Sequence, residues 1–308
     1  MQKLPVLMIV FNRPETTERV FSAVRQYAPE RLYVSADGPR PDKPDAENCA
    51  AVRKIFDRVD WPCEVKTRFR ERNLGCRKAP PDGISWFFEQ EEEGVILEDD
   101  CLPSPDFFRF CAEMLERYRD NKRVMHIGGA NFLGADFPRK ASYYFSNNPH
   151  IWGWASWQRA WQHYDNEMTE FPAYCRSGRI ARRIPGRPFE QWRFLQQMKA
   201  TYDHSPYFNT WDWQWTFTLF NSDGLSIIPN FNMISNIGFS GTHTVQSSVC
   251  ALPYAPLPET LIHPSEIRVD HQADSEIFQY FYKGTWKDRV HYWNNLLTLR
   301  FRNGIYKW

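Results

Sequence analysis

The stretch that decides the fold reads, over residues 94–108, Gly94-Val95-Ile96-Leu97-Glu98-Asp99-Asp100-Cys101-Leu102-Pro103-Ser104-Pro105-Asp106-Phe107-Phe108. Three aliphatic residues behind a glycine predict a buried strand, and Ser104 followed by Pro105 predicts the N-cap and first turn of a helix. Glu98, Asp99 and Asp100 therefore stand where a strand gives way to a helix. Adjacent carboxylates repel one another unless a cation or a hydroxyl-rich ligand compensates them, so the triplet predicts a metal site. The alternative is a solvated acidic turn.

Strand and helix patterns alternate on the N-terminal side of this stretch. The spacing predicts strands at residues 4–11, 32–36, 63–69 and 95–97, and helices at residues 14–27, 46–59 and 81–90. Such alternation favours a mostly parallel sheet that binds ligands at the carboxyl ends of its strands. We therefore expect the polar segments at these ends to share one crevice. They are Asn12-Arg13, Asp37-Gly38, Asn73-Leu74-Gly75 and Glu98-Asp99-Asp100.

The pattern changes on the C-terminal side. A strand at residues 124–127 leads into a turn containing Gly129, but residues 141–175 are aromatic and predict irregular structure. Helices are predicted at residues 189–202 and 213–221, a strand at 225–229 and a polar loop at 230–244. Residues 176–193 carry many arginines, which indicate either a solvated helix and loop or a site for an anionic acceptor.

Composition bounds the class of protein. The 308 residues suffice for one large α/β domain, and 38 basic against 37 acidic side chains give no overall attraction to nucleic acid. The seven cysteines form no CxxC set, so we expect reduced thiols. The opening residues lead directly into a predicted strand, and no apolar stretch reaches the roughly 20 residues needed to cross a bilayer. We expect a cytoplasmic protein, or a catalytic part without an anchor.

Aromatic residues make up 16% of the chain, with 13 tryptophans, several of which are clustered. The clusters are Trp152, Trp154, Trp157 and Trp161, then Trp211, Trp213 and Trp215. They are interleaved with Gly, Asp, Gln and Arg, which is compatible with a surface for stacking hydroxylated rings and also with an ordinary core.

Residues 4–245 resemble, in order, the catalytic domain of N-acetylglucosaminyltransferase I and related bacterial GT-A glycosyltransferases. The resemblance rests on residues 4–13, 34–38 and 95–108, and on Trp152-Gly153-Trp154 and Trp211-Asp212. It implies an α/β GT-A (Rossmann-like) fold, with a mostly parallel sheet flanked by helices and an irregular, aromatic-rich acceptor half. The implied catalytic domain covers residues 1–250, with a nucleotide-binding half at 1–130 and an acceptor half at 131–250. Residues 251–308 form a C-terminal extension outside the resemblance.

The resemblance also implies an inverting, metal-dependent transfer of a sugar, GlcNAc or a related hexose, from a UDP-sugar. The implied acceptors are a glycan, a lipid-linked saccharide or a glycopeptide, as in polysaccharide or lipopolysaccharide biosynthesis. Asp100 is the implied ligand of Mn2+, or of Mg2+, and Asp212 the implied general base. The implied donor-binding residues are Phe11, Asn12, Arg13, Asp37, Arg72, Asn73, Glu98, Asp99, Gly129 and His243. The acceptor residues are Trp154, Trp211 and Trp213, the last standing where the family tends to have a second acid.

Three alternatives stay open. A sugar nucleotidyltransferase would also use a parallel sheet and paired acids, and a carbohydrate-binding module would use the tryptophans without catalysis. His243 could also be an ordinary polar loop residue. The aromatic and basic tail at residues 286–308 predicts either packing on the catalytic domain or peripheral contact with an anionic inner membrane.

Overall fold

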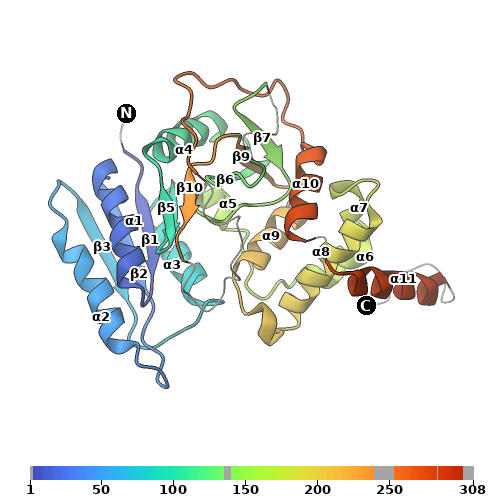
Figure 1. The fold of residues 1–308 in the computed structure, drawn as a ribbon, viewed down its shortest axis with the longest axis horizontal. Helices are drawn as coiled ribbons and strands as arrows, with labels where there is room; N and C mark the ends of the chain where they lie inside the picture. Colours follow the sequence, from blue (N-terminus) through green and yellow to red (C-terminus); the bar gives the residue numbers. More distant parts are fainter. Residues whose placement is uncertain (1–2, 135–139, 239–252, 283, 301–308) are drawn as a thin grey trace.

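One eight-stranded sheet forms the centre of the fold. Its strands are β1 (Val6–Val10), β2 (Arg31–Ala36), β3 (Glu64–Phe69), β4 (Glu93–Glu98), β6 (Val124–Gly128), β7 (Tyr143–Ser146), β8 (Trp154–Trp157) and β9 (Leu225–Pro229). The computed structural model describes residues 3–134, 140–238, 253–282 and 284–300. The order across the sheet is β3-β2-β1-β4-β8-β6-β9-β7, and only β7 and β8 run antiparallel to the other six (Figure 1). The predicted α/β class with a mostly parallel sheet is confirmed.

Helices flank this sheet and join its strands. They are α1 (Pro14–Tyr27), α2 (Ala46–Ile55), α3 (Ala79–Phe88), α4 (Pro105–Tyr118), α5 (Gln158–Trp161), α6 (Phe171–Ser177), α7 (Ile180–Arg183), α8 (Pro188–Tyr202), α9 (Asp212–Asn221), α10 (His271–Phe281) and α11 (Trp286–Arg300), with 3-10 turns η1 (Phe56–Arg58) and η2 (Pro206–Phe208). Proline opens α1, α4 and α8, where its missing N–H has no helical partner to lose. Ser104 stands at the predicted N-cap of α4, but its side chain makes no capping hydrogen bond.

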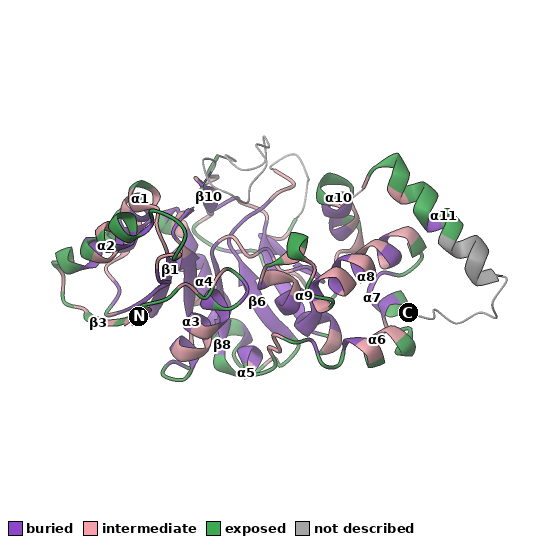
Figure 2. Ribbon diagram, turned by 90° about the horizontal axis from the view of Figure 1, so that it is seen from below, coloured by how far each residue is buried: buried purple, intermediate pink, exposed green. Residues whose placement is uncertain are grey.

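Side chains of β1 alternate between two cores, as the pleat of a strand requires. Val6, Met8 and Val10 pack on the face covered by α1, α2 and α4. Leu7 and Ile9 pack on the opposite face, against residues of α3, α5 and α9. Because both faces are covered, the central strands are almost wholly buried (Figure 2).

The prediction of irregular structure over residues 141–175 is wrong. This segment contains β7, β8, α5 and α6, and β8 inserts antiparallel between β4 and β6. Ala155 pairs with Val95 on one side and with Ile127 on the other. The sheet therefore continues without a break across the boundary expected near residue 130. The predicted loop at residues 230–244 likewise contains a strand, β10 (Ile234–Asn236), which pairs with β5 (Cys101–Pro103).

Part of the predicted C-terminal extension belongs to the folded body. Leu257 and Leu261 are buried in the core on the α1 and α4 face, and Phe278 of α10 is buried among residues of α6, α8 and α9. By contrast α11 lies at the edge of the molecule and is largely exposed in its described part (Figure 2). Among the described helices, none is long and apolar enough to span a membrane.

Candidate active site

The acid triplet lies where β4 ends, beside the chain that leaves β1. Arg13, one residue before α1, donates from both terminal guanidinium nitrogens. Its Nη1 contacts Asp100 Oδ2 at 2.8 Å, and its Nη2 contacts Asp99. The backbone N–H of Phe11 donates to Asp99 Oδ2 at 3.3 Å. The ends of β1 and β4 are thus held together around one guanidinium group.

This site carries more negative than positive charge. Arg13 faces three carboxylates, and Glu98 Oε1 is buried with no hydrogen-bond partner among the described residues. Burial, followed by the charges of Asp100 and Asp99, raises the pKa of Glu98 to about 8. Burial also raises the pKa of Asp99 to about 6, although Arg13 acts in the opposite direction. A further cation would relieve this repulsion.

The donor set fits a hard divalent cation such as Mn2+ or Mg2+, because all three side chains offer carboxylate oxygens. No group of three His, Cys, Asp or Glu side chains in the described part of the chain is arranged to hold a metal on its own. An ion held here would therefore depend on one or two protein oxygens together with oxygens of a bound ligand. The candidate protein ligands of such an ion are the Asp100 carboxylate and Glu98 Oε1, the atom without a hydrogen-bond partner among the described residues.

Asp212 is far from the triplet in sequence, but the fold brings its neighbour Trp211 onto Trp154, which pairs with Ile96 of β4. Asp212 is the first residue of α9, and its charge contributes to the raised pKa of Glu98. Thr210 Oγ1 donates a hydrogen bond to Asp212 Oδ1. Burial raises the pKa of Asp212, while this hydrogen bond and the N–H groups at the helix start act against the rise. A carboxylate with a raised pKa beside a group of acids is a reasonable proton acceptor.

Asp37, at the end of β2, holds a loop. Its carboxylate accepts hydrogen bonds from Asn73 Nδ2 at 2.9 Å, from the N–H of Leu74 at 2.9 Å and from the N–H of Gly75 at 3.0 Å. It also accepts from the N–H of Gly38 at 2.8 Å. A carboxylate has about four acceptor positions, so these donors fill it. Contact with a nucleotide base would require one of them to leave.

Asn12 and Arg72, two further predicted donor residues, differ in their surroundings. Asn12 Nδ2 donates to Asp45 Oδ1 at 2.7 Å. The Arg72 side chain is exposed, and its backbone packs against Gly38, where an added Cβ would lie 2.4 Å from the Arg72 carbonyl carbon. Arg72 is therefore available to a ligand, whereas Asn12 is already engaged.

One predicted donor residue, Gly129, is part of the packed interior. Gly129 is buried, and an added Cβ there would lie 2.6 Å from both Ile234 and Phe107. Its role in this structure is therefore the close packing of β6 against its neighbours. His243 lies outside the described residues.

The tryptophans predicted to contact an acceptor are mostly core. Trp154 is 1% exposed and Trp211 is 2% exposed, and their rings stack 5.9 Å apart. Trp215 and Trp161 complete this cluster on the sheet. Buried rings offer no face to a sugar, so the expectation of acceptor stacking is not supported for Trp154 and Trp211. Trp213 is half-buried against Phe194 and Tyr282.

Two residues near the site were not predicted. Tyr282, just after α10, packs against Trp213 with ring centres 5.7 Å apart, and its pKa is raised by burial and by the charge of Asp212. Gly238 lies on the Arg13–Asp100 pair, because an added Cβ would come within 2.2 Å of Asp100 Oδ2. No local motif marks Tyr282, since it comes from beyond the predicted catalytic domain. Gly238 falls within the loop predicted over residues 230–244, and that prediction was the one sequence feature that could have directed attention to it.

Comparison with known proteins gives a fold-level likeness only. No family model matches the sequence, and no curated protein matches it. Among solved structures, the mannosyltransferase PcManGT from Pyrobaculum calidifontis in complex with GDP-Man and Mn2+ is 11% identical, with a TM-score of 0.39 over 72% of this chain and 69% of that one. HddC from Yersinia pseudotuberculosis is 8% identical, with a TM-score of 0.33 over 51% of this chain and 77% of that one.

A third structure is UDP-glucose pyrophosphorylase complexed with UDP-glucose. It is 7% identical, with a TM-score of 0.35 over 73% of this chain and 90% of that one. At these sequence identities and TM-scores, the likeness does not show which reaction this chain catalyses, which sugar donor it uses or which metal it binds. The functional argument therefore rests on the residues of the site.

Proposed function

We propose that this protein is an inverting, metal-dependent glycosyltransferase that uses a UDP-sugar. The observation that carries the proposal is that the start of α9 lies beside β4. Trp211 stacks on Trp154, which pairs with Ile96 of β4, and the charge of Asp212, the next residue, acts on Glu98 at the end of that strand. Inversion needs one group that stabilises a leaving diphosphate and another that removes a proton from the acceptor hydroxyl. The acid triplet and Asp212 can fill these two roles.

On the donor side, Asp100 would hold the cation, with Glu98 and Asp99 available to sugar or ribose hydroxyls. When bound, the divalent ion supplies positive charge that offsets the charge of the leaving diphosphate. Arg13 bridges Asp99 and Asp100, so it keeps the acids in place and adds a second positive charge beside the diphosphate. Asp37 positions the loop Asn73-Leu74-Gly75, next to exposed Arg72.

On the acceptor side, Asp212 would take the hydroxyl proton as the hydroxyl oxygen attacks the anomeric carbon. Tyr164 and Tyr282 contact the residues that flank this acid. The Tyr164 hydroxyl donates to the Trp211 carbonyl oxygen at 3.3 Å, and the Tyr282 ring lies 5.7 Å from that of Trp213. Both tyrosines would limit the access of water to the base and position the acceptor. The acceptor class, a glycan or a lipid-linked saccharide, follows from the sequence resemblance.

A screen of nucleotide sugars without an acceptor tests the proposal. UDP-GlcNAc, UDP-glucose, UDP-galactose and GDP-mannose are incubated with Mn2+, with Mg2+ or with EDTA, and release of the nucleoside diphosphate is measured. We expect slow, metal-dependent release of UDP from one UDP-sugar, lost in Asp100→Asn. Asp60→Asn is the matched control, because Asp60 forms an exposed ion pair with Arg25 away from the site.

Other outcomes would contradict this function. Formation of a UDP-sugar and pyrophosphate from UTP and a sugar 1-phosphate, without donor hydrolysis, would instead show a nucleotidyltransferase. Saturable sugar binding with neither reaction would show a binding module. Stronger thermal stabilisation by GDP than by UDP would overturn the choice of nucleotide.

We also propose peripheral membrane contact through α11. Trp286 is 70% exposed, Val290 47% and Trp293 62%, and their spacing places them on one side of the helix. Lys287 and Arg289 add positive charge suited to anionic lipid. Sedimentation with phosphatidylglycerol vesicles at low salt should be lost when residues 286–308 are deleted. Equal sedimentation of the full chain and of the chain without residues 286–308 would show that α11 does not mediate membrane contact.

A further inference from the structure

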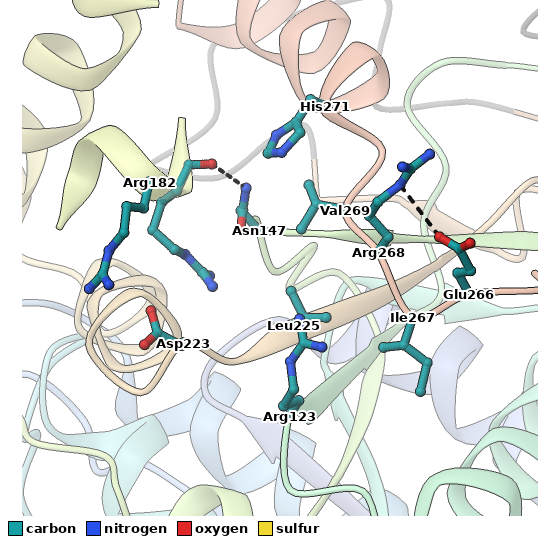
Figure 3. A pocket seen from close by; sticks show the side chains of 11 residues that line it. Arg123, Asn147, Arg182, Asp223, Leu225, Glu266, Ile267, Arg268, Val269 and His271 are labelled. Carbon is teal, nitrogen blue, oxygen red and sulfur yellow. Dashed lines mark hydrogen bonds and ion pairs between the residues drawn. The ribbon is translucent and has the colours of Figure 1, made fainter. Parts of the chain in front are cut away.

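A pocket of about 580 Å³ lies among β9, α7 and the segment before α10. Figure 3 shows Arg182 and Asp223 on one side of it, Glu266 and Arg268 on the other, Arg123 below and His271 above. Arg183, Asn147, Leu225, Ile267 and Val269 complete the lining. We call it the basic pocket.

The basic pocket is separate from the candidate active site. Arg123 directly precedes β6, Asp223 precedes β9, and Asn147 follows β7, whose Ser146 pairs with Ser226 near the start of β9. Since β6 and β9 run in the same direction as β4, these positions lie at the amino edge of the sheet. The acid triplet lies at the carboxyl edge. Five residues of strand at about 3.3 Å each separate the two edges by roughly 15 Å.

Positive charge in the basic pocket is only partly compensated. Its two carboxylates already have partners, because Asp223 pairs with Arg179 at 3.1 Å and Glu266 lies 4.0 Å from Arg268. The exposed Arg123 and Arg182 side chains have no hydrogen bond or ion pair among the described residues. Two guanidinium groups are therefore free at the rim.

A third arginine is fixed in the wall. Arg183 is 7% exposed, and its Nη2 donates to the carbonyl oxygen of Gly224 at 2.7 Å. Its Nε is buried without a partner, and its guanidinium group lies 4.9 Å from the centre of the Phe220 ring. In the described part of the chain, no carboxylate comes within ion-pair distance of Arg183. A buried cation held in this way costs free energy unless an anion approaches it.

We propose that the basic pocket binds a phosphate-type oxyanion, such as the phosphoryl group of a phosphorylated sugar or of a lipid headgroup. Arginine suits this ligand because its planar fork can donate two parallel hydrogen bonds to phosphate oxygens. Arg123, just before β6, and Arg182 of α7 reach the rim, and Arg183 adds charge from the wall. A neutral sugar would leave these charges uncompensated.

Nearby charged groups support this site. Burial lowers the pKa of His271, and the neighbouring Arg187, Arg183 and Arg268 lower it further, against the opposing effect of Asp270. The positive potential that disfavours a protonated His271 would attract an anion. A bound phosphate should therefore raise the pKa of His271, which gives a local readout of occupancy.

The test compares two double variants of the full chain by calorimetric titration with inorganic phosphate. Arg123→Ala/Arg182→Ala removes the two free rim arginines. Lys54→Ala/Arg176→Ala changes the net charge equally at exposed positions outside the pocket, and neither side chain has a hydrogen bond or ion pair in the described structure. We expect phosphate affinity to fall by at least about tenfold in the pocket variant and to stay within about twofold in the control. Equal affinities, or no saturable binding to the wild type, would overturn the proposal.

Two further arms complete the test. In NMR titrations, with His271→Gln used for assignment, phosphate should raise the His271 pKa in the wild type but not in the pocket variant. An unchanged His271 in phosphate-saturated wild type would contradict the site. Sedimentation with phosphatidylglycerol vesicles separates the two phosphate sources. Weaker sedimentation of the pocket variant than of the control identifies a lipid headgroup, and equal sedimentation with lost phosphate affinity identifies a soluble phosphorylated compound.

Discussion

At the scale of single residues, the candidate active site is organised by unequal charge. Glu98, Asp99 and Asp100 face one guanidinium group, and the glycine at position 238 lets the backbone close over the pair that Arg13 makes with Asp100. The repulsion among these carboxylates is reduced in two ways. Arg13 neutralises part of their charge, and burial favours the protonated forms of Glu98 and Asp99. Ligand binding and proton release should therefore be linked at this site.

The first prediction concerns the proposed base. Asp212→Asn should lower turnover by about 10²- to 10⁴-fold, because an amide cannot accept the hydroxyl proton, while UDP binding stays unchanged. Burial raises the pKa of Asp212, so wild-type activity should rise with pH as this acid loses its proton. The midpoint of this rise in the pH–activity profile should lie above the ordinary pKa of an aspartate. Transfer assays across pH measure both effects.

Asp203→Asn is the control for this substitution, because Asp203 pairs with Lys199 on the surface of α8. It should retain wild-type turnover. Wild-type turnover in Asp212→Asn, or an acid limb that persists in that variant, would exclude Asp212 as the base.

The second prediction concerns two buried histidines on the tryptophan side of the sheet. Trp215 Nε1 donates to His126 Nδ1 at 3.2 Å, and His126 Nε2 lies 3.1 Å from the His150 carbonyl oxygen, so the neutral ring satisfies both nitrogens. Burial lowers the pKa of His126 to about 3 and that of His150 to about 4. Unfolded histidine titrates near 6.5, so the unfolded state binds more protons below that pH.

The stability contributed by the neutral rings should therefore be complete above about pH 6.5 and should fall as the pH drops from there through about 4 for His150 and about 3 for His126. Urea unfolding at several pH values measures this loss. NMR of the His126 ring gives a direct check, since its signals should remain those of a neutral imidazole at pH 5. A His126 ring that titrates near its ordinary pKa would contradict the assignment.

At the scale of elements, β8 decides how the sheet is completed. It supplies Trp154, which packs against Trp161, Trp211, Trp215 and His126 on one face of the sheet. The start of α9, which carries Asp212, rests on this cluster through Trp211 and Trp215. The aromatic cluster therefore positions the proposed base by packing and does so without contacting a ligand.

The third prediction tests this packing role. Trp154→Ala should lower the free energy of unfolding by about 3–5 kcal/mol, since it leaves a large cavity beside α9. Trp293→Ala removes the same side chain from an exposed position on α11 and should change stability by no more than about 0.5 kcal/mol. Urea unfolding of both variants provides the measurement. Equal losses would show that Trp154 is not part of the core.

At the scale of the whole molecule, the segment after residue 252 completes the fold. Leu257 and Leu261 cover the sheet beside α4, and α10 packs Phe278 against α8 and α9 (Figure 1). Asp274 of α10 accepts hydrogen bonds from Ser146 and from the N–H of Asn147 at the end of β7. The segment therefore contributes buried side chains to the core beside α4 and to the core formed by α6, α8 and α9.

The fourth prediction follows from this arrangement. Deletion of residues 253–308 should abolish cooperative unfolding, because it exposes apolar surface of two core clusters. Deletion of residues 284–308 should retain it, because the described side chains of α11 are mostly exposed. Their contacts with α8 are the packing of Tyr292 on Phe189 and Trp192, the ion pair of Asp288 with Arg193 and the contacts of Arg289 and His291 with the same two rings. Thermal unfolding followed by circular dichroism distinguishes the two. A cooperative transition at the wild-type temperature after the longer deletion would contradict this role.

The alternation of strands and helices from residue 4 to the start of α4 could be predicted from the sequence, because periodicity, glycines and prolines act locally. It also placed Arg13 and the acid triplet at strand ends that meet, since parallel strands end at one edge. Asp212 was named from the resemblance to a family, and its distance from the triplet is a property of the fold.

Which aromatic residues belong to the core depends on long-range packing, because the same tryptophan-rich segment can face a ligand or a neighbouring helix. The pairing of β8 between β4 and β6 depends on contacts about 60 residues apart in sequence, which no local pattern contains. Long-range packing also brings Tyr282 towards the start of α9. It likewise places Arg123 and the pair Arg182-Arg183 around one pocket. Long-range packing brings together residues whose own neighbours in the sequence carry no sign of the contact.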